Sequence, residues 1–273
     1  MPKKEIKNTK KNSSLDDNIY VKTALAAIAI ILILIGGLIG YKIKNSENIK
    51  TKETYQATAD EKKFKKEYEI LNGTMRSNGE VNKEISIIED NNIEYINVEK
   101  AADILKEGSG IIYFGFAACP WSRNAVPILL NAMQSTDLDK IYYVNIRPND
   151  DEYQDIREKY TAVKNKAKKT KEALSPRYDE ILNSLSEFLP DYTVVGTNGK
   201  TINVGKKNLV SPTVAVVKNG VVLDVHSSTV EGHNKIDGLL PDMTKEATNQ
   251  LFNRYSSMIA NYLEDGCPID TTC

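Results

Sequence analysis

The sequence predicts an α/β domain that a single transmembrane helix holds at a membrane. Three observations lead to this expectation. An uncharged apolar segment occupies residues 23–41, apolar runs alternate with helix-like segments between residues 93 and 146, and one apolar run ends on Cys119 where the next such segment begins. Alternation of this kind is typical of β-α-β units, whose neighbouring strands run parallel with right-handed crossovers.

The composition fits one good-sized core with appendages. The 273 residues are 41% hydrophobic and 27% charged. A formal net charge of -1 gives no reason to expect nucleic acid as a partner. The sequence contains no phosphate-binding glycine loop, and its two histidines, His226 and His233, stand at no ligand spacing, so we expect neither a cofactor nor a metal.

Residues 23–41 predict a helix that crosses the membrane once. They read TALAAIAIILILIGGLIGY, and as a helix they would span roughly 28 Å, enough for a bilayer. Lysines are frequent in residues 1–22, so the positive-inside rule places this tail in the cytoplasm and the rest of the chain outside. Because no clear cleavage site follows the apolar core, we expect a retained anchor in the cell membrane rather than a cleaved signal peptide.

Two segments separate this anchor from the domain. Residues 42–62 are polar, with almost no large apolar side chains, and are expected to be a spacer. Residues 63–91 are expected to be an N-terminal extension. A short amphipathic helix is predicted there around Phe64 and Tyr68, followed by an edge strand at residues 84–88.

The domain is expected to occupy residues 92–265. Hydrophobic periodicity and turn residues predict most of its elements. Strands are expected at 93–98, 110–116, 140–146, 192–196 and 200–204 and on both sides of Asn219-Gly220, and helices at 99–106, 120–134 and 239–263. Residues 150–190 are expected to be an insertion of two or three helices, whose lysines between 164 and 171 form a solvated helix face or, alternatively, an interaction surface.

Cys119 is the candidate nucleophile. At the start of a helix, unpaired backbone N–H groups and the positive end of the helix dipole favour thiolate over thiol. Pro120 suits the first turn because it lacks an N–H, and Arg123 adds a nearby positive charge. The alternative is that Cys119 is an inert buried cysteine.

The residues around this cysteine resemble the redox site of the thioredoxin superfamily. Cys119-Pro120-Trp121-Ser122 is similar to its Cys-x-x-Cys motif, with serine in place of the second cysteine. Residues 113–116 (Tyr-Phe-Gly-Phe), Arg123-Asn124 and Val126-Pro127 look like the thioredoxin-like proteins of Gram-positive bacteria described as bacteriocin transport accessory proteins. The resemblance implies a thioredoxin-like fold, which is a central mixed sheet flanked by helices.

The resemblance also implies a substrate groove. In the thioredoxin fold a cis-proline opens the strand after the crossover helix and packs against the active-site cysteine, and Pro212 matches it in order and context. Ser211 would then present backbone groups to a substrate peptide, beside Pro120, Trp121 and Arg123. The alternative is an ordinary trans-proline at the start of a strand.

Ser122 limits the chemistry of the motif. In dithiol enzymes the second cysteine attacks the mixed disulfide and releases the substrate, which a serine hydroxyl cannot do. The position of the acid that thioredoxins bury before the first cysteine is Tyr113 here, and that of their tryptophan is Ala118, so the usual proton relay is absent. Cys119 alone is expected to accept and hold a partner.

Residues 266–273 are a tail with two cysteines, Cys267 and Cys273. Nearby cysteines outside the cytoplasm generally oxidise, so we expect them to form a local structural disulfide. So small a ring would stabilise the fold by roughly 2 kcal/mol, which is weak for a staple. The alternative is that one of the pair resolves a mixed disulfide on Cys119.

Two functions of different classes remain open. The first is monothiol exchange through Cys119 with protein or peptide thiols and disulfides, in which a reductant, a membrane redox partner or the tail cysteines complete the cycle. The second is a binding or accessory module, for example in peptide or bacteriocin export, that keeps the groove without turnover. The retained Cys119 and Arg123 favour the first, and the loss of the resolving cysteine favours the second.

Overall fold

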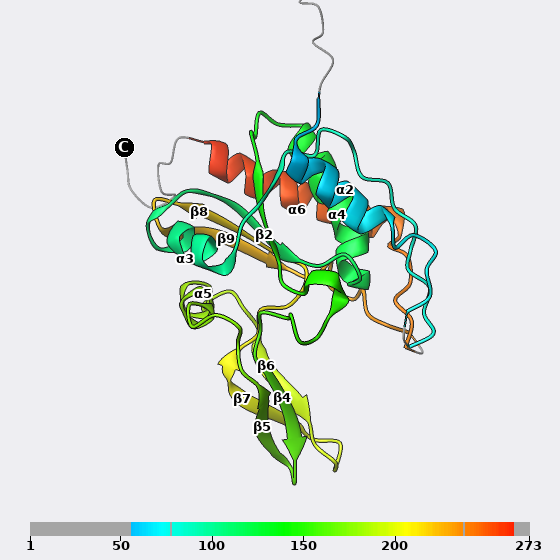
Figure 1. Ribbon diagram of the computed structural model, residues 1–273, viewed down its shortest axis with the longest axis vertical. Helices are drawn as coiled ribbons and strands as arrows, with labels where there is room; N and C mark the ends of the chain where they lie inside the picture. The colour runs from blue at the N-terminus through cyan, green and yellow to red at the C-terminus, as the bar shows by residue number, and fades with distance from the viewer. Residues whose placement is uncertain (1–55, 77, 237, 265–273) are drawn as a thin grey trace, which may run out of the picture. The chain divides into compact units, whose positions relative to one another are not determined.

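A five-stranded mixed sheet lies at the centre of the structure, a computed structural model that describes residues 56–76, 78–236 and 238–264 (Figure 1). The strand order is β1-β3-β2-β8-β9, with the bounds β1 (Ile93–Tyr95), β2 (Gly110–Gly115), β3 (Ile141–Asn145), β8 (Thr213–Lys218) and β9 (Val221–Ser227). β3 pairs in parallel with β1 and β2, whereas β8 runs antiparallel to β2 and β9. The α/β class is therefore confirmed.

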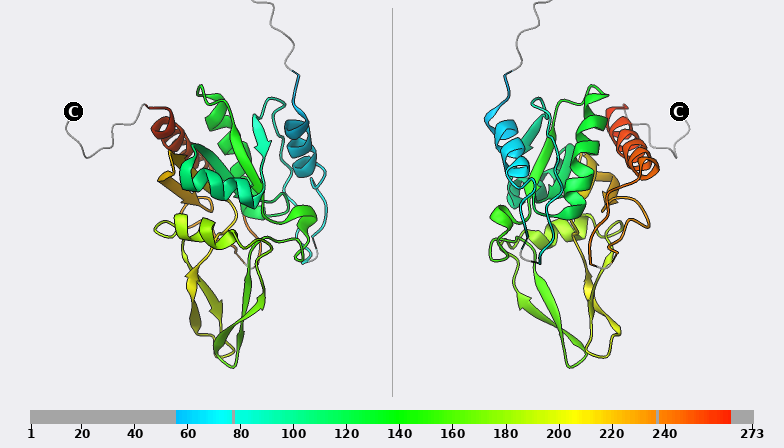
Figure 2. Two further views of the ribbon diagram at one scale, coloured as in Figure 1. Left: turned by 60° about the vertical axis from the view of Figure 1, so that its left-hand side comes forward. Right: turned by 90° about the vertical axis from the view of Figure 1, so that its right-hand side faces the viewer.

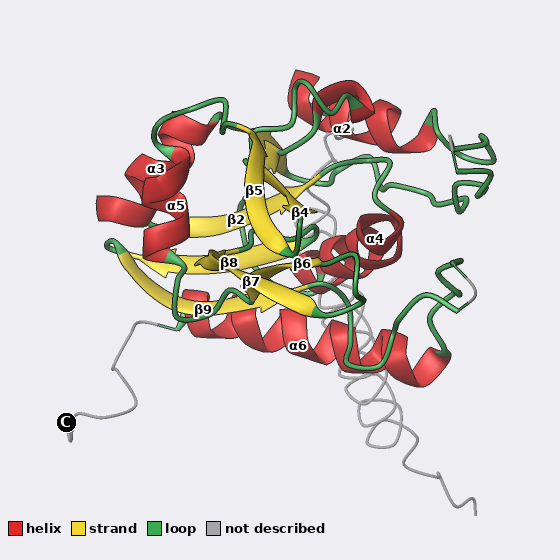
Figure 3. Ribbon diagram, turned by 90° about the horizontal axis from the view of Figure 1, so that it is seen from below, coloured by secondary structure: helices red, strands yellow, loops and turns green. Residues whose placement is uncertain are grey.

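Helices cover both faces of this sheet (Figure 3). Their bounds are α2 (Ala59–Glu69), α3 (Val98–Glu107), α4 (Pro120–Gln134), α5 (Tyr178–Ser184) and α6 (Lys245–Leu263). α3 and α5 pack on one face, and α2, α4 and α6 pack on the other. Two hydrophobic clusters result, one on each side of the sheet.

β2 shows why the centre of the sequence forms this sheet. All six of its residues are buried, as a continuous apolar run predicts for a strand covered on both faces. Ile111 and Tyr113 join the cluster under α4, whereas Ile112 and Phe114 join the cluster under α3, because successive side chains point to opposite faces. The predicted central strand and the helix after it are confirmed.

Side-chain caps place the starts of two helices differently from the expectation. Thr58 forms a capping box with Glu61, so α2 begins at Ala59, inside the segment that was expected to be polar spacer. Thr244 accepts a hydrogen bond from Ala247 N, and α6 therefore begins at Lys245 rather than at residue 239. The buried residues of α6 are Leu251, Tyr255, Met258 and Ile259.

The expected edge strand at residues 84–88 is wrong. Side chains from the end of α2 and from the turn after it hydrogen-bond the N–H and C=O groups of this segment that would otherwise pair with a neighbouring strand. The Asn72 amide bonds both Ile85 O (2.8 Å) and Ile85 N (3.1 Å), and Glu69 Oε1 accepts from Ile87 N (2.8 Å). Side-chain hydrogen bonds thus hold this segment against the domain, in place of the backbone hydrogen bonds of a paired strand.

The expected helical insertion at residues 150–190 is also largely wrong. A hairpin of β4 (Lys159–Val163) and β5 (Lys166–Lys171) precedes α5, which is the one α-helix of this part. Lys164 and Asn165 have positive φ values of 50° and 58°, as a two-residue hairpin turn requires. Lys164, Lys166 and Lys168 recur every second residue, which is the period of a strand rather than of a helix face.

The predicted second hairpin is confirmed. It consists of β6 (Asp191–Val195) and β7 (Thr201–Lys207), which pair antiparallel around Asn198-Gly199. The two hairpins, residues 159–171 and 191–207, project together from the domain and are called the arm below (Figures 1 and 2).

Several expectations lie outside the described residues. They are the cytoplasmic tail at 1–22, the anchor at 23–41, most of the spacer, and the cysteines Cys267 and Cys273. Within the part of the chain that the structure describes, no helix combines the length and the apolar character needed to cross a membrane.

Candidate functional site

Cys119 lies where β2 passes into α4. It is the N-cap residue of α4, with Pro120 in the first turn, and no side chain caps the first N–H groups of the helix. Its side chain is a free thiol and is only 4% exposed. The sequence therefore predicted its position correctly, and the structure adds that the thiol is covered.

Ser211 is the direct partner of this thiol. Cys119 Sγ donates to Ser211 O at 3.3 Å, and the Ser211–Pro212 peptide bond is cis, the isomer that the resemblance implied. The sheet register explains the approach, because β2 pairs with β8 so that Phe114 lies opposite Thr213. A carbonyl oxygen only accepts, so this contact belongs to the protonated thiol.

Ser122 belongs to a chain of buried hydroxyl groups. Its Oγ lies 2.9 Å from Ser211 Oγ, it hydrogen-bonds Tyr113, and the Tyr113 and Tyr68 hydroxyls are 2.7 Å apart. Burial raises the pKa of both tyrosines, which therefore stay protonated. Tyr113 stands where the resemblance implies a buried acid, and a connected set of hydroxyls takes that place.

Carbonyl and amide oxygens hold the Arg123 side chain inside the domain. Its side chain is completely buried, and all five of its N–H donors have oxygen partners. The partners are the carbonyl oxygens of Tyr68, Lys83 and Ala117 and the side chain of Asn72. Burial lowers the pKa of the Arg123 guanidinium. These contacts tie α4 to the N-terminal extension.

Arg157 binds the segment that leads to Ser211, the partner of Cys119. Its Nη1 donates to Leu209 O (3.2 Å), and its Nε and Nη2 bind both oxygens of Asp155 at 2.9 and 2.7 Å. Burial acts to lower the pKa of Arg157, but Asp155 outweighs this effect and raises it, with a smaller contribution from Cys119. Arg157 lies in the insertion, so no local signal connected it with the motif.

Trp121 faces the loop that follows β9. Its Nε1 donates to His233 O (3.4 Å), and Lys235 Nζ lies 5.7 Å from the centre of its ring. Lys235 also pairs with Glu80 at 2.6 Å. The start of α4 is thus in contact with both the loop after β9 and the N-terminal extension.

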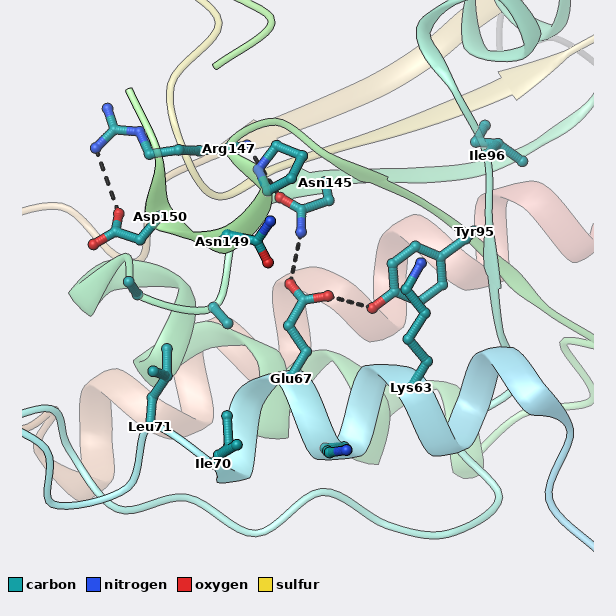
Figure 4. Close-up of a pocket in the computed structure, with 14 residues that line it drawn as sticks. Lys63, Glu67, Ile70, Leu71, Tyr95, Ile96, Asn145, Arg147, Asn149 and Asp150 are labelled. Carbon is teal, nitrogen blue, oxygen red and sulfur yellow. Dashed lines mark hydrogen bonds and ion pairs between the residues drawn. The ribbon is translucent and has the colours of Figure 1, made fainter. Parts of the chain in front are cut away.

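A cavity of about 730 Å³ lies beside the residues that precede Cys119 (Figure 4). It is bounded by α2 and by the carboxyl ends of β1, β2 and β3, a place where open α/β sheets bind ligands. Its apolar lining is Ile70, Leu71, Ile96, Pro148, Ala117 and Ala118, and its cations are Lys63, Lys66 and Arg147. Neither Cys119 nor Ser211 lines it.

Two acidic residues line this cavity, Asp150, which pairs with Arg147 at 3.6 Å, and Glu67. The Glu67 carboxylate accepts from Tyr95 Oη (2.5 Å), Tyr143 Oη (3.1 Å) and Asn145 Nδ2 (2.7 Å), of which Figure 4 shows the first and the last. Burial raises the pKa of Glu67, and the two tyrosine hydroxyls act against the rise. The sequence suggested no role for this residue, since its donors come from two strands, β1 and β3, that are distant from Glu67 in the chain.

Within the described residues no cluster of His, Cys, Asp and Glu side chains could hold a metal ion. We also compared the chain with known proteins. No protein-family model, no curated protein and no solved structure matches it.

Proposed function

We propose that this chain is a membrane-anchored, extracytoplasmic protein with a thioredoxin-like fold, in which Cys119 exchanges disulfides with protein or peptide substrates. The observation that carries the proposal is the position of the Cys119 thiol, at the uncapped start of α4 and 3.3 Å from the Ser211 carbonyl. A mixed sheet with helices on both faces supports the fold.

The proposed exchange has two balanced steps. In the first, the Cys119 thiol loses its proton to solvent, and its sulfur attacks one sulfur of a substrate disulfide. A bond forms between Cys119 and that sulfur, and the other substrate sulfur leaves as a thiolate and takes up a proton. In the second, an external thiol attacks the mixed disulfide and restores Cys119, because the Ser122 hydroxyl cannot do so.

Cys267→Ser/Cys273→Ser protein in a non-ionic detergent provides the test. We expect glutathione disulfide to form a mixed disulfide with Cys119 that mass spectrometry detects, and Cys119→Ser to abolish it. Ser122→Cys adds a resolving thiol, so it should release glutathione and leave an internal disulfide. If Cys119 reacts only after denaturation, the exchange proposal is wrong.

One observation favours a binding or accessory module as the second candidate. The cavity under α2 is of ligand size, yet it is separate from the covered Cys119 thiol. Photo-crosslinking to an apolar peptide would separate the two functions. A binding module should keep its crosslink in Cys119→Ser and lose it in Ile70→Asp. A substrate groove at Cys119 should instead lose the crosslink in Cys119→Ser and keep it in Ile70→Asp.

A further inference from the structure

The two hairpins of the arm form a single body. Tyr192 Oη accepts from Tyr160 N (3.2 Å), and the two rings meet edge to face with centroids 5.3 Å apart. At the tip, Asn165 Oδ1 accepts from Thr197 Oγ1 (3.1 Å) and from Asn198 N (3.4 Å). Contacts at both ends therefore hold the hairpins against each other, and each hairpin presents one side outward.

The outward sides of the two hairpins differ in charge. On the first hairpin, Lys166 lies opposite Val163, Lys168 lies opposite Thr161, and Lys164 occupies the turn. All three lysines are exposed, and none of them has an ion pair within the described residues. We call Lys164, Lys166 and Lys168 the basic face.

The opposite side of the arm is neutral apart from Lys200 in the turn of the second hairpin. Thr193, Val195 and Thr201 are exposed on the second hairpin, where Val195 lies opposite Thr201. Other lysines of the arm are already neutralised, because Lys159 pairs with Glu152 at 2.8 Å and Lys207 with Asp191 at 2.9 Å. Among the exposed lysines of the arm that have no ion pair within the described residues, three form the basic face and one, Lys200, lies in the turn of the second hairpin. The free positive charge is thus concentrated on one side of the arm, although the whole chain has a net charge of -1.

We propose that the substrates of Cys119 are polypeptides with an acidic, extended segment, and that this segment docks on the basic face. Lysines two residues apart on a strand are about 7 Å apart, which matches acidic side chains on one side of an extended peptide. This inference rests on the proposed exchange function, and it adds the class of substrate.

A single-stranded nucleic acid, another polyanion, fits the basic face less well. The aromatic rings of the arm, Tyr160 and Tyr192, face each other between the hairpins and are not available for stacking with bases.

The base of the arm connects docking with the thiol. Arg157, two residues before β4, holds the carbonyl of Leu209, and Ser211 follows shortly after Leu209. Ser211 is in turn the partner of Cys119. A segment held on the arm would therefore keep the rest of its polypeptide near the thiol and raise its local concentration there.

The test uses the full chain in non-ionic detergent and a fluorescein-labelled octaglutamate peptide. Lys164→Gln/Lys166→Gln/Lys168→Gln removes three positive charges from the basic face. Thr193→Glu/Val195→Glu/Thr201→Glu changes the net charge equally but on the neutral side, and is the matched control. We expect the first variant to weaken peptide binding about tenfold more than the control does, and added salt to reduce the difference.

A second readout separates this inference from the proposed function. Octaglutamate with an added terminal cysteine, joined to glutathione through a disulfide, should react with Cys119 about tenfold faster than glutathione disulfide. The lysine-to-glutamine variant should abolish only this advantage. The inference is overturned if both variants lose the same amount of peptide binding. It is also overturned if the octaglutamate disulfide reacts with Cys119 no faster than glutathione disulfide does. Tighter binding of phosphatidylglycerol vesicles or of a single-stranded oligonucleotide also overturns it. Binding without any exchange overturns the proposed function instead.

Discussion

Arg123 is the largest side chain that the described residues bury completely. No carboxylate is among its hydrogen-bond partners, so carbonyl and amide dipoles stabilise its charge. Removing the guanidinium would leave these oxygens buried without donors. The residue that the motif suggested as an aid to the thiol is therefore expected to matter for stability.

We predict that Arg123→Leu lowers the free energy of unfolding by about 3 kcal/mol, because it leaves several buried carbonyl oxygens unsatisfied. Urea unfolding of the variant and the wild type measures the difference. Arg177→Leu is the control, since this arginine pairs with Asp103 and Glu180 at the surface. A loss in Arg177→Leu as large as that in Arg123→Leu would contradict the argument.

His226 is a residue whose protonation should affect stability. Burial lowers its pKa, and the ring is further influenced by the Thr229 carbonyl, which raises the pKa, by Arg254, which lowers it, and by Asp224, which raises it. His226 Nε2 lies 2.6 Å from Thr229 O, so this nitrogen carries the proton of the neutral ring. The folded protein thus prefers the neutral form.

The stability that depends on neutral His226 is present above the unfolded pKa of about 6.5 and is lost as the pH falls below it. The unfolded chain then takes up a proton more readily than the folded one. We predict that the free energy of unfolding decreases from pH 7.5 to pH 5 more steeply in the wild type than in His226→Gln. Urea titrations at several pH values measure both slopes, and parallel curves would refute the prediction.

At the scale of elements, the turn residues and the two-residue period of the side chains explain why residues 159–171 form a hairpin rather than a helix. Lys164-Asn165 forms a tight turn with two left-handed residues, and the lysines around it alternate with other residues. A prediction of helices from the charge of this segment ignored that alternation. The Asn219-Gly220 turn between β8 and β9, in contrast, has a strong hairpin signature and was predicted correctly.

Gly220 offers a test of this turn. Its φ is +75°, and an added Cβ would lie 2.2 Å from Lys106 O. We predict that Gly220→Ala lowers the free energy of unfolding by about 2 kcal/mol or more, from backbone strain together with the clash. Gly199→Ala is the matched control, because its φ of +74° is similar but nothing lies within 4 Å of the added Cβ.

Thermal unfolding of the two glycine variants gives the comparison. Strain alone predicts a loss of about 1 kcal/mol for Gly199→Ala. A larger loss of stability in Gly199→Ala than in Gly220→Ala would contradict this explanation. The close approach of the Lys106 carbonyl would then not be the reason for glycine at position 220.

At the scale of the whole molecule, the described residues from Gln56 onward form a compact unit of their own. Its described part contains hydrophobic clusters on both faces of the sheet. We predict that a fragment beginning at Gln56 is soluble without detergent and unfolds in one cooperative transition, whereas the full chain stays in the membrane fraction after alkaline extraction. Release of the full chain by alkali would contradict the proposed anchor.

The sequence by itself determined the central strand, the helix after Cys119, the Asn219-Gly220 turn and the place of the thiol at a strand-to-helix junction. Each of these depends on neighbouring residues, through hydrophobic periodicity, turn conformation or a helix start. Only the tertiary structure decided that the Cys119 thiol donates to Ser211 O, that Arg123 binds the extension, that Arg157 holds the Leu209 carbonyl and that two hairpins form one arm. These features arise from contacts between segments far apart in the chain, for which local patterns contain no signal.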